Sequence, residues 1–173
     1  GERIRALDFV DWYYSSQSRF LRKAVRLVRK YFPNKEIIIS MGYGSQRTCY
    51  GNDDVGIARL CSDLGIACQT PGNIPYFCMK SLSTPCRVYN VPYYTEPPGR
   101  VDRVAQVHRI WSDASCGATT FFDYPGNLLG ARDLIAKYAS MLDGVMPIVD
   151  TAVFFPTTEH RLSDQDWPQR TIA

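Results

Sequence analysis

The sequence predicts an α/β fold in which strands and helices alternate, and three observations support this prediction. Residues 36–43 form a β-branched run of the kind found in parallel strands that are buried on both faces. Residues 88–96 form a second apolar and aromatic run, which Pro97-Pro98-Gly99 prevents from continuing. Segments beside these runs carry apolar residues at helical spacing. The chain has 173 residues, of which 45% are hydrophobic, and this is enough for one core.

The elements follow one another in a regular order. The predicted elements are helices over 7–32, 52–64, 101–115 and 131–142, and strands over 36–43, 66–70, 88–96, 118–124 and from 147 onward. Residues 74–86 show no clear pattern, apart from a poor helical turn at 79–82. Gly65 and the Pro125-Gly126-Asn127 segment are typical of element ends.

The first predicted helix has an apolar and a basic face. Its apolar face consists of Phe20, Leu21, Ala24, Val25, Leu27, Val28, Tyr31 and Phe32. Its basic face consists of Arg19, Arg22, Lys23, Arg26, Arg29 and Lys30. A basic face can bind nucleic acid, but an outer helix usually has a solvated charged face, and the net charge of the chain is only +3. We therefore expect no nucleic-acid partner. We also expect Trp12, near the start of this helix, to be buried, because large aromatic side chains usually pack.

Glu96 is the main candidate functional residue. It ends the apolar run 88–96, so it is expected at the carboxyl end of a buried strand, where ligands bind in α/β folds. A carboxylate flanked by tyrosines and prolines can be desolvated and aimed, as a nucleophile or an acid must be. A glutamate that caps the helix after Arg100 is an equal alternative at this point.

Composition excludes several classes of site. The six cysteines, at 49, 61, 68, 78, 86 and 116, form no CxxC pair, and the chain has two histidines, so no metal site is predicted and the thiols are expected to be reduced and buried. No Gly-rich phosphate loop is present, and no cofactor is expected. No apolar run reaches the length of a membrane span, so no membrane partner is expected.

The order of elements and the segment around Glu96 resemble a known family. Tyr93-Tyr94-Thr95-Glu96-Pro97-Pro98-Gly99 resembles the nucleophile strand of clan A retaining glycoside hydrolases, in particular beta-galactosidase-like members. The segment 9–14, with the basic helix that ends at Tyr31-Phe32-Pro33, is similar to the helix that follows the fourth strand of their (β/α)8 barrel. Residues 149–156 resemble the first strand of the accessory domain that follows the barrel. The resemblance covers residues 8–158.

The resemblance implies the C-terminal half of a (β/α)8 TIM barrel, strands five to eight, over residues 1–146, and the start of a further domain over 147–173. It implies a retaining hydrolase of β-linked sugars with Glu96 as nucleophile. The implied substrate-binding residues are Tyr43, Asn73, Tyr94, Asp123, Tyr124, Gln46 and Arg47. We expect the side chain of Glu96 to face the barrel axis near the strand-end residues of this set.

The sequence departs from the family in one respect. The general acid/base of the clan is a glutamate that follows an asparagine, and this sequence has no Asn-Glu pair. A non-catalytic module that binds carbohydrate, or another partner, through the same pocket is therefore the alternative function. Four strands cannot close a barrel, so the expected partner is an N-terminal half-barrel in the same or another chain, or a second copy in a homo-oligomer.

Overall fold

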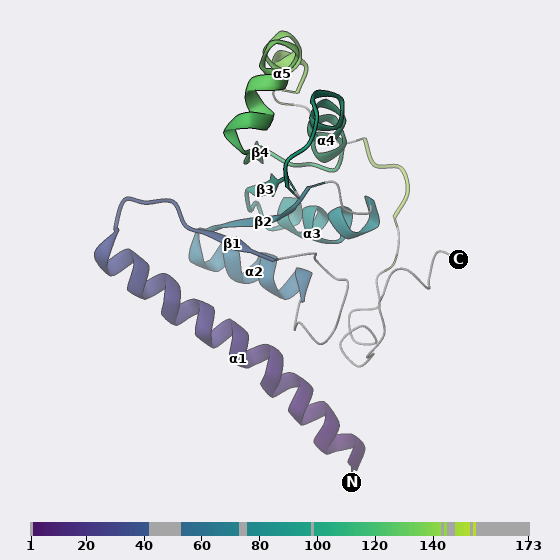
Figure 1. The fold of residues 1–173 in the computed structure, drawn as a ribbon. Helices are drawn as coiled ribbons and strands as arrows, with labels where there is room; N and C mark the ends of the chain where they lie inside the picture. The colour runs from purple at the N-terminus through teal and green to yellow at the C-terminus, as the bar shows by residue number, and fades with distance from the viewer. Residues whose placement is uncertain are drawn as a thin grey trace.

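The computed structural model describes residues 2–41, 53–72, 76–97, 99–142, 144, 148–152 and 154. It confirms an α/β fold built on one parallel sheet of four strands in the order β1-β2-β3-β4 (Figure 1). The strands are β1 (Ile38–Ser40), β2 (Ala67–Pro71), β3 (Tyr93–Glu96) and β4 (Thr120–Phe121). Neighbours in the sheet are also neighbours in the chain, and a helix connects each strand to the next. This is the repeating strand–helix unit that the sequence predicts.

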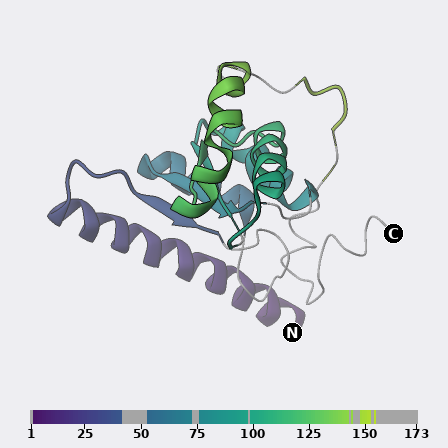
Figure 2. The same cartoon turned by 45° about the horizontal axis from the view of Figure 1, so that its top comes forward.

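The helices lie before, between and after the strands. They are α1 (Glu2–Tyr31), α2 (Asp54–Leu64), α3 (Tyr76–Val88), α4 (Arg103–Ser115) and α5 (Pro125–Tyr138), with a short 3-10 turn, η2 (Ala139–Met141), after α5. Figures 1 and 2 show α1 running along the α2 side of the molecule, and in Figure 1 its N-terminal end extends away from the sheet. The helix boundaries follow local chemistry. The Asp53 carboxylate accepts a hydrogen bond at the start of α2, and Gly65, with φ 58°, ends it.

The register of the strands separates the sheet into two faces, because successive side chains along a strand point to opposite sides. One face, called here the helix face, carries Ile39, Cys68, Thr70, Tyr93 and Thr95, which are paired across the sheet. The other, called here the open face, carries Ser40, Gln69, Tyr94, Glu96, Thr120 and Phe122. The helix face belongs to the hydrophobic core, and the two faces therefore have different roles.

The core lies between the helix face and the helices. It contains Val25, Met41, Ile57, Ala58, Cys61, Ile66, Cys68, Leu82, Cys86, Val91 and Tyr93. The five described cysteines are free and buried, as the sequence predicts. Cys61 and Cys68 are hydrogen-bonded, with 3.3 Å between their sulfur atoms. This bond, together with burial, raises the pKa of Cys61, so the thiol stays protonated and unreactive. Among the described residues, no helix is long and apolar enough to cross a membrane.

Several expectations from the sequence need correction, and most of them concern element boundaries. Helix α5 begins at Pro125 rather than at 131, and β4 covers only two residues of the expected strand 118–124. Residues 76–88 form α3, although 74–86 showed no helical pattern and Pro85 lies within it. Buried Cys78, Met79 and Leu82 hold this helix in place, so packing overrides its weak propensity. Because Val88 belongs to α3, the strand that ends at Glu96 begins only at Tyr93. The described residues of the segment from 147 onward, 148–152 and 154, form no strand. A strand needs a neighbouring strand to pair with, and these residues have none among the described residues.

A further correction concerns Trp12. Its exposed fraction is 58%, so the expectation that it is buried is wrong. Trp12 lies near Phe9, with 5.9 Å between the ring centroids, and Phe9 is also exposed. Trp12 and Phe9 therefore contact each other while both stay exposed, whereas Tyr14 in the same segment is buried.

Gly72, directly after β2, provides a test of the packing at the strand ends. A Cβ at this position would lie 2.3 Å from Oδ2 of Asp113, which is fully buried. We expect Gly72→Ala to lower the free energy of unfolding by about 1–3 kcal/mol, because the buried carboxylate would have to move. Urea unfolding followed by circular dichroism measures the change.

Gly126→Ala is the matched control, since Gly126 lies in the first turn of α5 and an added Cβ there would meet nothing within 4 Å. We expect no loss of stability in this variant. Equal stability of the two variants would contradict the close packing of Gly72 on Asp113.

Candidate functional site

Glu96 is the last residue of β3, so the structure places it at the carboxyl end of a strand, as predicted. Its side chain is half-buried, between Thr95 and Pro97, which are both buried. Its backbone carbonyl accepts a hydrogen bond from Gly72, which joins the ends of β2 and β3. The pairing of Glu96 with Pro71 puts its carboxylate on the open face, away from the core. Glu96 therefore does not pack as a core residue, and it lies at the edge of the sheet where (β/α)8 barrels carry their active sites.

Tyr94 lies on the same face, two residues before Glu96. Its ring packs edge-to-face on Phe122, with 5.7 Å between the centroids, and its hydroxyl donates a hydrogen bond to the Glu36 carboxylate. This hydrogen bond, with a further contribution from burial, raises the pKa of Tyr94 above the usual value of about 10. Tyr94 thus connects β3 with the segment before β1 and the residue after β4.

Glu36 is a second carboxylate on this side of the sheet, but it lies far from Glu96 along the strands. Gln69 is paired with Ser40, and Glu36 stands four residues before Ser40. Glu96 is paired with Pro71, two residues beyond Gln69. The backbone of Glu36 therefore lies before the start of β1, at the amino end of the sheet, whereas Glu96 lies at the carboxyl end. The Glu36 carboxylate accepts its hydrogen bond from Tyr94 at the amino end of the sheet, so it is not assigned as the partner carboxyl that a retaining glycosidase needs about 5–5.5 Å from its nucleophile.

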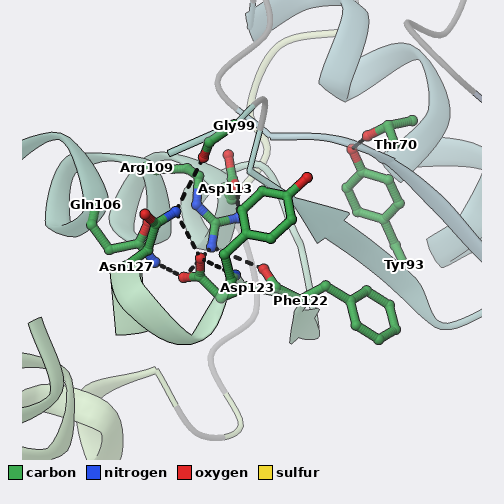
Figure 3. Close-up of polar contacts among 10 residues, drawn as sticks. Thr70, Tyr93, Gly99, Gln106, Arg109, Asp113, Phe122, Asp123 and Asn127 are labelled. Carbon is green, nitrogen blue, oxygen red and sulfur yellow. Dashed lines mark hydrogen bonds and ion pairs between the residues drawn. The ribbon is translucent and has the colours of Figure 1, made fainter. Parts of the chain in front are cut away.

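Asp123, which follows β4, is held by protein groups rather than left free for a ligand (Figure 3). Oδ2 accepts hydrogen bonds from Gln106 and from Arg109, the latter at 3.1 Å. Oδ1 accepts from the backbone N–H of Tyr124 at 2.8 Å and from Nδ2 of Asn127 at 3.1 Å. The Asp123 side chain is 5% exposed. In this structure Asp123 anchors the start of α5, and its role as a hydroxyl-binding residue stays a prediction.

The partner of Asp123 is a fully buried cation. The Arg109 side chain, 2% exposed, also pairs with Asp113 at 3.3 Å and donates to the carbonyl of Phe122 at 3.2 Å. Arg109 and Asp113 are four residues apart on α4, a spacing typical of ion pairs on a helix. The sequence spacing could therefore have indicated the pair of Arg109 and Asp113. The contact of Arg109 with Asp123 joins different elements, so the spacing along α4 could not have indicated it.

The remaining predicted site residues divide into two groups. Tyr124 is described: it directly precedes α5 and its exposed fraction is 51%, so its side chain is accessible to a ligand. Tyr43, Asn73, Gln46 and Arg47 lie outside the described residues. The expected grouping of Glu96 with Tyr43 and Asn73 therefore stays a prediction. Within the described part of the chain, no group of three His, Cys, Asp or Glu side chains could hold a metal ion.

Comparison with known proteins agrees with this geometry at the level of fold. No family model matches the chain, and no curated protein matches its sequence. Among solved structures, the catalytic domain of beta-amylase from Paenibacillus polymyxa is similar, with a TM-score of 0.61 and 13% identity. The likeness covers 75% of this chain and 41% of that barrel domain. The chain has the fold of part of a (β/α)8 barrel. At this identity the likeness shows the fold alone.

The buried cluster around Arg109 can be tested by substitution. We expect Arg109→Met to lower the free energy of unfolding by about 3–5 kcal/mol, because it leaves two buried carboxylates without their cation. Arg103→Met on the same helix is the control, since Arg103 and its partner Asp133 are exposed, at 52% and 68%. Removing that pair should cost about 1 kcal/mol or less. If urea midpoints of the two variants coincide, Arg109 does not hold the strand ends.

The bond between Tyr94 and Glu36 predicts a dependence of stability on pH. We expect Tyr94→Phe to cost about 1 kcal/mol below pH 10, since the hydrogen bond is lost while the ring contact with Phe122 remains. A raised pKa in the folded state means that the contribution of Tyr94 is present below pH 10 and is lost as pH rises through that raised value. The difference in unfolding free energy between wild type and variant should shrink above pH 10. A constant difference from pH 7 to pH 11 would contradict the bond.

Proposed function

We propose that this chain is the C-terminal half of the catalytic barrel of a glycoside hydrolase, and that Glu96 is its nucleophile. The observation that carries the proposal is the position of Glu96: a half-buried carboxylate at the carboxyl end of a barrel strand, on the face that does not pack in the core. Active sites of (β/α)8 enzymes are built at this end of the strands. The likeness to a beta-amylase catalytic domain supports the same class of fold.

The proposed reaction is retaining hydrolysis of a β-linked sugar, as in beta-galactosidase-like enzymes. Glu96 attacks the anomeric carbon and forms a glycosyl-enzyme bond, while a second carboxyl protonates the departing oxygen. Water then attacks the anomeric carbon, gives its proton to that second carboxyl, and releases Glu96. The proposal assigns the second carboxyl to the complementary half-barrel, because Glu36 lies at the amino end of the sheet and is bonded to Tyr94.

The neighbouring residues would form the sugar subsite. Tyr124 offers an exposed ring at the end of β4, which could stack on a sugar face. Tyr94 would support the wall of the site below Glu96 through its contacts with Phe122 and Glu36. Tyr43, Gln46, Arg47 and Asn73 follow β1 and β2 in the sequence and would supply hydroxyl contacts. We further propose that residues 147–173 begin the next domain.

One observation favours a second candidate, a non-catalytic carbohydrate-binding or interaction module. The described residues of the open face place one carboxylate, Glu96, at the carboxyl end of the sheet. A mechanism-based glycosyl fluoride distinguishes the two candidates. A covalent adduct on Glu96, located by mass spectrometry in the complete protein, supports the enzyme, whereas reversible sugar binding without an adduct supports the module.

The direct test is Glu96→Gln in the complete protein. We expect sugar hydrolysis to fall by roughly a thousandfold or more, because the amide cannot act as the nucleophile. The circular dichroism spectrum should be unchanged, since the Glu96 side chain has no core role. Hydrolysis of an aryl β-glycoside, followed by absorbance, gives the rate, and NMR of the product anomer shows whether the configuration is retained.

Asp133→Asn is the matched control, because it makes the same change of a carboxylate to an amide at an exposed position on α5. Its hydrolysis rate should stay close to that of the wild type. Full activity in Glu96→Gln would disprove the assignment of the nucleophile, and an inverted anomer would disprove the retaining mechanism.

A further inference from the structure

Helix α1 carries an apolar stripe that is separate from the face it packs against α2. The stripe consists of Phe9, Tyr13, Phe20, Leu27 and Tyr31. Their spacings of four, seven, seven and four residues place them within an arc of about 40° around the helix. Phe9, Phe20, Leu27 and Tyr31 are each 59–73% exposed, and Tyr13 stacks on Phe9 with 6.3 Å between the ring centroids. Five large side chains along one line of a 30-residue helix form an apolar surface that needs a partner.

The stripe cannot be covered by rotation of α1, because its other face is held. Val25 is buried in the core and Leu21 packs against it, roughly 100–140° around the helix from the stripe. Arg22 pairs with Asp63 of α2 at 3.1 Å, and Arg29 donates a hydrogen bond to the carbonyl of Leu64. These contacts determine which side of α1 faces outward.

The strand next to α1 is also incomplete on one side. β1 pairs with β2 and ends the described sheet, so its other edge has no neighbouring strand among the described residues. In the same order, α1 packs on α2 and α2 packs on α3. The stripe and the β1 edge therefore both lie where the preceding strand–helix unit of a barrel would extend the sheet and the layer of outer helices.

The charges beside the stripe indicate the character of that unit. Arg19, Lys23, Arg26 and Lys30 lie along the flank of the stripe that is opposite Leu21 and Val25, and all four are exposed. A second copy of this chain would bring its β4 to the β1 edge and its α5 to α1. The charged residues of α5 are Arg132, Asp133 and Lys137, and Asp133 already pairs with Arg103. A second copy would thus place cations against cations.

We propose that the stripe and the β1 edge bind the last strand–helix unit of an N-terminal half-barrel located upstream of Gly1 in the same polypeptide. Its strand extends the sheet in parallel beside β1. Its helix packs an apolar face on Phe20 and Leu27 and presents acidic side chains to Lys23 and Arg26. This proposal names the partner that the proposed hydrolase requires, but it rests on the fold and not on hydrolysis, so its test is independent of activity.

Hydroxyl-radical footprinting of aromatic side chains is the test. The 173-residue chain is compared with the polypeptide extended upstream through the preceding strand–helix units. We expect Phe20 and Tyr31 to be oxidised several-fold more slowly in the extended polypeptide. Tyr76 on α3 is the internal control, because its exposed fraction of 60% matches the stripe residues and its oxidation should not change.

The charge component is tested in the extended polypeptide with Lys23→Glu/Arg26→Glu. We expect this variant to lose most of the protection of Phe20, whereas Lys35→Glu/Arg59→Glu, with the same change of charge at exposed positions off the stripe, should keep it.

Equal oxidation of Phe20 and Tyr31 in the short and extended chains would overturn the proposal. Protection in the 173-residue chain that rises with concentration, with a dimer mass by light scattering, would assign the surface to a second copy and also overturn it. Full protection in Lys23→Glu/Arg26→Glu would overturn the acidic character of the partner.

Discussion

The position of the buried Arg109 guanidinium is the constraint on which the ends of the strands depend. A buried cation is tolerated when its charge is compensated, and Asp113, Asp123 and a backbone carbonyl engage Nη1 and Nη2 of Arg109. Asp113 in turn lies against Gly72, which is bonded to the carbonyl of Glu96. One ionic cluster on α4 thus connects the carboxyl ends of β2, β3 and β4, and it does so behind the candidate nucleophile rather than beside it.

The short strand β3 shows how stability and function are divided between alternate residues. Tyr93 and Thr95 face the helices, where Tyr93 bonds to Thr70 with 2.7 Å between the oxygens. Tyr94 and Glu96 face the other way. A shift of β3 by one residue would bring Glu96 into the core and would expose Tyr93, so the apolar packing that stabilises the sheet also aims the carboxylate. The position of Glu96 on the open face is for this reason a consequence of the core.

The parts of the structure that the sequence predicts are those controlled by local chemistry. Alternating strands and helices, the Gly65 terminus and the strand end at Glu96 all follow from residues close in the chain. Where contacts between distant residues decide, sequence reasoning fails. Helix α3 forms despite Pro85 because its buried side chains pack. Asp123, similarly, meets Arg109 across two elements, so its sequence context gave no sign that its carboxylate was engaged. Trp12 is exposed although aromatic residues usually pack, because α1 extends along one side of the molecule beyond its contacts with α2.

The two surfaces left incomplete in the described chain differ in chemistry, and this difference indicates how a barrel would close. The open face carries the hydroxyls of Ser40 and Thr120, the amide of Gln69 and the Glu96 carboxylate beside the rings of Tyr94 and Phe122, so only its polar part can remain in contact with water. The stripe on α1 has little polar character and gains most from being covered. The free energy of joining a second half-barrel would therefore come mainly from the outer helices and from backbone pairing at the β1 edge. The interior could then keep polar groups at the mouth, where a sugar would bind, without loss of the apolar burial that holds the halves together.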